Sequence, residues 1–94
     1  MKGTEKQIKW AEDIKAQAIA AAGCIVRNAE KAEANNIPKD AYYISVEVAR
    51  DIEQMVIAGF DQMDSAAAII DIRDRFTQSA LEKMARAETR RRAQ

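Results

Sequence analysis

Residues 4–34 decide the fold, and they read TEKQIKWAEDIKAQAIAAAGCIVRNAEKAEA. Thr4 and Gln7 have the spacing of a capping box, in which each side chain bonds the backbone amide of the other residue at a helix start. From there, apolar and small residues recur every three or four positions and so line one face of a helix. These residues are Ile8, Ala11, Ile14, Ala18, Ile19, Ala22, Ile25, Val26, Ala29 and Ala32. The stretch predicts one long helix over about residues 4–34.

Two more helices are predicted after a break at residues 35–38, which read NNIP. Proline disfavours helical geometry in the residue before it but suits a first helical turn. Apolar residues at helical spacing then predict helices over about residues 38–58 and 65–90. Gly59 is the expected C-terminal cap of the first of these, and Asp61 or Asp64 the expected N-cap of the second. The predicted fold is all-α, a three-helix bundle.

One short segment allows a different structure. Residues 43–49 read YISVEVA, in which apolar and polar types alternate. Such alternation is typical of a half-buried strand. A strand here is therefore the alternative to the first turns of the second helix.

The length predicts a single helical domain, residues 1–94, around one core. Although 48% of the residues are hydrophobic, nineteen residues are alanine and only Leu81 is leucine, so the core has little side-chain surface. Burial stabilises by roughly 25 cal/mol per Å² of apolar surface, and small helical proteins often make up a deficit by association. A homodimer or another homo-oligomer is therefore a plausible form beside the monomer.

Charge is balanced over the whole chain and segregated along it. Fifteen basic and fifteen acidic residues give a net charge of zero, yet residues 1–39 carry +2, residues 40–81 carry −5 and residues 82–94 carry +3. The zero total argues against a protein whose whole surface attracts nucleic acid. Residues 87–94 form a basic tail, which is either a frayed, solvated end or an arm that contacts phosphates or an acidic partner.

The chemistry that the sequence lacks argues against catalysis. It contains no histidine, which removes the usual general base near neutral pH and the commonest transition-metal ligand. The lone Cys24 permits neither an internal disulfide nor a cysteine-rich zinc site, and no glycine-rich phosphate loop is present. Asp71 and Asp74 alternate with arginines, so an ion-paired face is the economical interpretation. We predict no catalytic residues, no metal and no cofactor, with a carboxylate-based, metal-assisted enzyme as the alternative.

The sequence also predicts the cellular location. No apolar run approaches the roughly 18–20 residues that a membrane span requires. The first residues, MKGT, lack the apolar stretch of a signal peptide. We expect a cytoplasmic protein with no membrane partner.

Trp10 lies at the border of the apolar face of the first predicted helix. Core anchoring is the simpler expectation, and a partner or ligand surface is the alternative, because tryptophan is enriched at interaction sites. Together with the charged residues near it and the C-terminal arginines, it gives the candidate binding residues. They are Lys6, Lys9, Trp10, Asp71, Arg73, Arg90, Arg91 and Arg92.

Two blocks of sequence resemble a known family when they are taken together. They are GTEKQIKWAEDI at residues 3–14 and AAIIDIRD at residues 67–74. They are similar to a G-S/T-E/P-K-Q-x-x-W-A-E-x-I opening and a later W/I-I-D-x-R block in small proteins and appended modules from bacterial phages, plasmids and other mobile elements. Ile69 stands where tryptophan often stands in that family. The resemblance implies a genomic setting and no defined activity.

If the first and third helices are adjacent, the two blocks form one cluster. Trp10 would then pack near Ile69, Lys6 or Lys9 would pair with Asp71, and Arg73 would pair with Glu12 or Asp13. Such a cluster is a structural lock if its charges are paired, and a binding site if they are exposed.

We therefore predict a non-enzymatic binding protein whose partner is a host or phage protein. In the phage setting that the resemblance implies, small proteins without catalytic groups often inhibit host defence, such as a CRISPR nuclease. The alternative is a small nucleic-acid-binding module that uses the C-terminal arginines with Lys6, Lys9 and Lys15, and its binding would weaken steeply with salt. A small ligand held between subunits is a further alternative.

Overall fold

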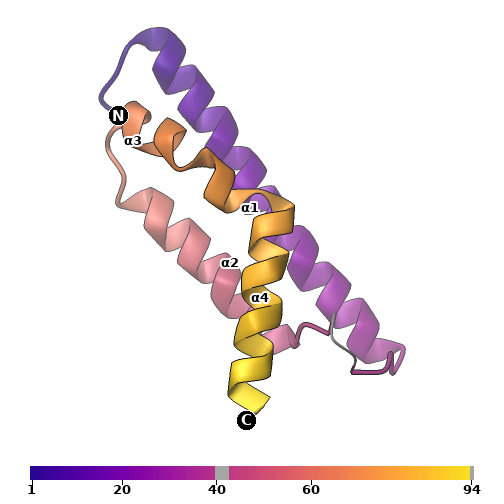
Figure 1. Ribbon diagram of the computed structural model, residues 1–94. Coiled ribbons are helices and arrows are strands. Elements are labelled where there is room, and N and C mark those ends of the chain that lie inside the picture. Colours follow the sequence, from indigo (N-terminus) through magenta and orange to yellow (C-terminus); the bar gives the residue numbers. More distant parts are fainter. Residues whose placement is uncertain (40–42, 94) are drawn as a thin grey trace.

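The computed structural model describes residues 1–39 and 43–93, and its regular structure is helical (Figure 1). The elements are α1 (Glu5–Ala34), α2 (Val46–Asp61), α3 (Ala66–Asp71), the 3-10 helix η1 (Arg73–Phe76) and α4 (Gln78–Ala93). The described residues contain no β-strand. The predicted all-α class is confirmed.

Helix α1 forms as the sequence predicts. The Thr4 side chain accepts a hydrogen bond from the Gln7 amide (3.2 Å), and the Gln7 side chain accepts one from the Thr4 amide (3.0 Å), so the capping box is complete. The helix ends at Asn35, and Asn36 then adopts a positive φ of 52°. Its buried face is the predicted one, made of Ala11, Ile14, Ala18, Ala22, Ile25, Val26 and Ala29.

Helix α2 begins later than predicted, so the expected helix over 38–58 is wrong at both ends. Ser45 has extended backbone geometry, and its hydroxyl accepts a hydrogen bond from the Val48 amide, which starts the helix there. The Ser45 amide donates in turn to the hydroxyl of the buried Thr89 in α4. Residues 40–42 of the predicted helix lie outside the described residues. The strand alternative is also wrong, because the chain is helical from Val46 onward.

The end of α2 differs from the prediction as well. Gly59 lies inside the helix, which continues to Asp61, so the predicted glycine cap is wrong. The next helix, α3, is capped by Ser65 and not by Asp61 or Asp64, since the Ser65 hydroxyl accepts a hydrogen bond from the Ala68 amide.

The predicted helix over 65–90 is divided into three elements, which corrects the three-helix bundle. Helix α3 ends at Asp71, and η1 follows as one tight turn. Thr77 is extended (φ −68°, ψ 156°), and its hydroxyl accepts a hydrogen bond from the Ala80 amide, so α4 has its own start. The break lets Phe76 pack against Phe60 of α2, with ring centroids 5.0 Å apart.

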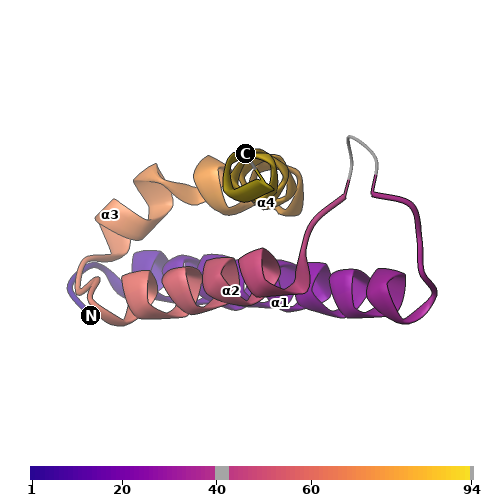
Figure 2. The ribbon, with the colours of Figure 1, turned by 90° about the horizontal axis from the view of Figure 1, so that it is seen from below.

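The helices form two layers. Helices α1 and α2 lie side by side and antiparallel, and α3, η1 and α4 cross one face of this pair (Figure 2). Helix α1 contacts α2, α3, η1 and α4. The largest fully buried side chains come from all four α-helices and are Phe60, Ile25, Ile69, Leu81, Val48 and Val56. The molecule is elongated, with extents of 48 × 24 × 18 Å.

The residues before α1 attach its start to α3. The Lys2 amide donates to the Asp64 carbonyl (2.6 Å), and the Ala66 amide donates to the Lys2 carbonyl (2.8 Å). Gly3 follows with a φ of 147°, and a Cβ at that position would lie 2.9 Å from the Cβ of Ala66. The two sequence blocks at residues 3–14 and 67–74 are therefore neighbours in the fold.

Candidate interaction surface

Trp10 lies on α1 beside η1 and is 49% exposed. The expectation that it anchors the core is therefore wrong. Successive residues of a helix are about 100° apart, so the buried positions Ala11 and Ile14 leave Trp10 at the edge of the buried face. The guanidinium of Arg73 lies 5.3 Å from the centroid of its ring, within the range of a cation–π interaction.

The ion pairs predicted around Trp10 do not form. Arg73 contacts neither Glu12 nor Asp13, and within residues 1–39 and 43–93 no carboxylate lies within ion-pair distance of its guanidinium. Its Nη1 donates instead to the carbonyl of Ile70 (2.7 Å). Lys6, Lys9 and Asp71 are exposed and likewise have no ion pair in the described part of the chain. The charged cluster is therefore not a structural lock.

A hollow of about 440 Å³ lies between α1 and the η1–α4 junction, and we call it the Trp10 trough. Its lining combines apolar side chains of α1 and η1 with polar and charged side chains. The lining residues are Trp10, Ile14, Gln17, Ala18, Ala21, Arg73, Asp74, Phe76, Thr77 and Gln78. Of these, only Trp10 and Arg73 were among the predicted site residues. The trough depends on the helix break at Thr77. In the sequence, the only sign of this break is that threonine is a residue type that suits an N-cap.

The C-terminal arginines are not a frayed arm, because α4 stays helical through Ala93 and packs against α2. Arg92 contacts Asp51 (2.9 Å), Glu88 (3.0 Å) and Glu47 (3.4 Å). Arg91 also binds Glu88. The predicted tail at residues 87–94 is thus an ordered helical end as far as residue 93, and residue 94 lies outside the described residues.

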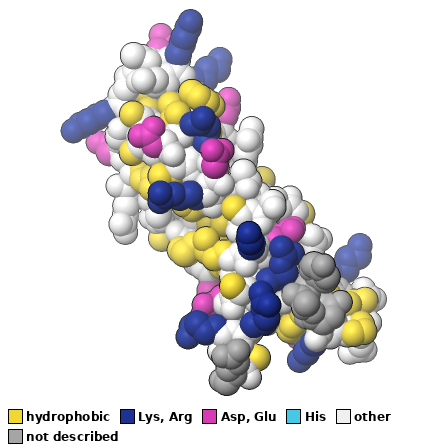
Figure 3. Space-filling view, in the orientation of Figure 1, with side chains coloured by type: hydrophobic (Ala, Val, Ile, Leu, Met, Phe, Trp, Pro, Cys, Tyr) yellow, Lys and Arg dark blue, Asp and Glu magenta, His cyan; other side chains and the backbone are white. Residues whose placement is uncertain are grey.

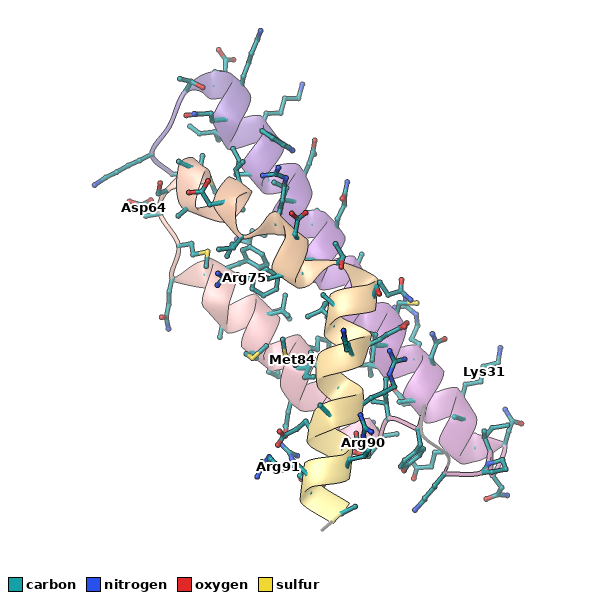
Figure 4. The ribbon with its side chains drawn as sticks, viewed as in Figure 1. Lys31, Asp64, Arg75, Met84, Arg90 and Arg91 are labelled. Carbon is teal, nitrogen blue, oxygen red and sulfur yellow. The ribbon has the colours of Figure 1, made fainter. Side chains whose placement is uncertain are left out.

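Arg90 differs from its two neighbours. It is exposed and has no ion pair within the described residues, and it leaves α4 on a different side from Arg91 (Figure 4). Basic side chains gather over α4, whereas basic and acidic side chains are mixed over the opposite end of the molecule (Figure 3).

The carboxylate of Glu88 titrates far from its ordinary range. Hydrogen bonds from Arg91 and then Arg92 lower its pKa from 4.5 to about 2. Because the folded pKa lies below the unfolded one, this group stabilises the fold above pH about 4.5, and the contribution is lost as the pH falls toward about 2.

We therefore expect Glu88→Gln to lower stability near neutral pH and to weaken the loss of stability in acid. Urea unfolding followed by circular dichroism, at several pH values between about 7 and about 2, measures both effects. Glu12→Gln is the control, because Glu12 has no ion pair among the described residues. A Glu88→Gln curve parallel to that of the control would contradict the assignment.

Other chemistry is sparse. Among residues 1–39 and 43–93, no group of three or more histidine, cysteine, aspartate or glutamate side chains is arranged to hold a metal ion. Cys24 is partly buried, and its Sγ lies 3.7 Å from the amide nitrogens of both Asn28 and Gln78. In the described part of the chain, no helix has the length and apolar character needed to cross a membrane.

Comparison with known proteins finds no matching family model, curated protein or solved structure. The resemblance to phage and mobile-element proteins stays a prediction.

Proposed function

We propose that this chain is a non-enzymatic interaction protein that binds another protein through the Trp10 trough. The observation that supports this most is the half-exposed Trp10 beside Arg73 in a concave surface. Tryptophan and arginine are enriched among the few residues that supply most of the binding energy at protein interfaces. The half of Trp10 that stays in water contributes nothing to folding, and its burial against a partner would add to the binding energy.

A protein partner fits this surface better than a nucleic acid. Two of the three arginines predicted to contact phosphates, Arg91 and Arg92, instead bind carboxylates of α2 and α4, which leaves Arg90 as the one without an ion pair among the described residues. The trough itself carries Asp74 beside Arg73, and the chain has no net charge. A polyanion would meet repulsion as well as attraction here.

The proposal also covers the location, the partner and the association state of the protein. In the cytoplasm of a bacterium that carries a phage or mobile element, the partner would be a host protein or complex, such as a defence nuclease, or a phage protein. We also propose that two copies associate, which is supported by the elongated shape. Its radius of gyration is 14.8 Å, whereas about 12 Å is typical of a compact chain of this length.

Trp10→Ala tests the proposal. The tagged protein is mixed with bacterial lysate, and captured proteins are quantified by mass spectrometry at low and high salt. We expect the variant to lose a partner that the unaltered protein retains at high salt, with a drop of about tenfold or more, since a central tryptophan contributes roughly 2 kcal/mol or more. Met55→Ala is the matched control, because Met55 is similarly exposed on α2 and does not line the trough.

Two outcomes would contradict the proposal. One is equal capture by Trp10→Ala and the unaltered protein, which would remove the trough from the interface. The other is capture of nucleic acid alone, lost as salt rises, which would support the phosphate-binding alternative.

A further inference from the structure

The guanidinium of Arg73 is oriented by two contacts and has no counter-ion among the described residues. The Ile70 carbonyl accepts one of its hydrogen bonds (2.7 Å), and the guanidinium lies over the Trp10 ring (5.3 Å to the centroid). A guanidinium carries five N–H donors in a planar fork that matches the two oxygens of a carboxylate. Most of these donors are uncommitted, because no carboxylate among the described residues lies within ion-pair distance.

The other end of the molecule shows how this chain pairs an arginine that serves the fold. Arg92 contacts three carboxylates, and Arg91 contacts one of the same three. Arg73 is oriented by one backbone carbonyl and one aromatic ring, and its charge is left open beside the trough. An open, oriented charge is what a binding site for an anion requires.

The rest of the trough favours an apolar group next to that anion. Ile14 and Ala18 line it and are largely buried, and Phe76, another apolar lining residue, packs against Phe60. The volume of about 440 Å³ lies within the roughly 300–1,000 Å³ of typical ligand pockets. An apolar side chain can therefore enter while a neighbouring group stays near Arg73 at the rim.

The charge of the trough favours an anion of one charge. Asp74 also lines the trough, so a phosphate group, which carries nearly two negative charges, would be repelled more strongly there than a carboxylate. A single carboxylate matches the Arg73 fork. We infer that the trough recognises a segment of the partner protein in which an aromatic or aliphatic side chain is followed by glutamate or aspartate. This inference rests on the proposed function and specifies the chemistry of its partner.

The single tryptophan of the chain makes the test direct, since the fluorescence of Trp10 reports on the trough itself. The intact protein is titrated with the doubly capped dipeptide acetyl-Phe-Glu-amide and, separately, with acetyl-Phe-Gln-amide. These probes contain no tryptophan and differ only in the charged group. We expect a saturable change with both and an affinity about tenfold higher for the glutamate probe, as expected for a charge-assisted hydrogen-bonded pair.

Substitutions assign the preference to one side chain. Arg73→Gln should remove the tenfold preference, and Arg73→Lys should keep a weaker one, because lysine has the charge without the planar fork. Arg75→Gln is the control and should leave the preference intact. Arg75, labelled in Figure 4, also belongs to η1 but does not line the trough.

The inference is overturned if the two probes bind equally, if neither gives a saturable change, or if Arg73→Gln keeps the preference. Such a result is separable from failure of the proposed function. If Trp10→Ala still loses its partner from lysate, the trough is an interface that reads a different chemistry. If that loss is absent as well, both proposals are wrong.

Discussion

Phe60→Ala is expected to lower the free energy of unfolding by about 3–5 kcal/mol, as is typical when a buried phenylalanine is truncated. Phe60 is 2% exposed and ranks among the largest fully buried side chains. Its ring also contacts Phe76 at a centroid distance of 5.0 Å and an interplanar angle of 52°. The substitution therefore leaves a cavity beneath η1 and removes an aromatic pair.

A loss of this size is a large part of the total stability of a small domain, which is roughly 5–15 kcal/mol. Urea unfolding followed by circular dichroism measures it, and Phe60→Leu should cost clearly less because it keeps most of the volume. Met55→Ala on the same helix is the exposed control and should change stability by about 0.5 kcal/mol or less. A Phe60→Ala variant as stable as this control would show that the layers do not meet at Phe60.

Gly3→Ala is expected to destabilise the protein by about 1–3 kcal/mol, the usual cost of a residue held in a disfavoured backbone region. The φ of 147° is rarely adopted by residues with a side chain, and the new Cβ would lie 2.9 Å from the Cβ of the buried Ala66. Relief of this clash would pull Lys2 away from Asp64 and Ala66, whose backbone groups it bonds.

Gly59→Ala is also a glycine-to-alanine substitution, but it is expected to raise stability. Gly59 lies within α2, and a Cβ there would meet nothing within 4 Å. Because glycine is unfavourable inside a helix, alanine should stabilise the protein by about 0.5–1 kcal/mol. Thermal unfolding of both variants tests the pair, and a Gly3→Ala protein with an unchanged or raised melting temperature would contradict the docking of residues 1–3 on α3.

Local signals predicted the parts of this fold that local interactions determine. The capping box at Thr4 and the periodic apolar face set α1 almost to the residue. The start of α2 was misplaced because Pro38 permits a helix there, whereas Ser45 is selected by two bonds, one of them to Thr89 in α4. A contact between residues so far apart in the chain leaves no periodic pattern in the sequence.

The same distinction applies to the candidate site. The two sequence blocks were expected to form one cluster if their helices were adjacent, and α1 does pack against α3 and η1. The contact between Arg73 and the Trp10 ring was not predicted, because Arg73 was expected to pair with Glu12 or Asp13. The predicted ion pairs of Arg73, and the frayed arginine tail, were wrong. An arginine pairs with whichever carboxylates the tertiary fold brings near it. Arg92 of α4 pairs with Glu47 and Asp51 of α2, and the spacing of charges along the chain does not indicate that these two helices meet.

The division at Thr77 gives the Trp10 trough two walls of unequal stiffness. One wall is α1, a helix of thirty residues. The other includes η1 and follows the six-residue α3, and helices this short are marginal in water on their own. They keep their shape through Ile69 and Phe76, which pack on the core. A ligand entering the trough therefore meets one rigid side and one that can adjust to it without unravelling α1 or α2.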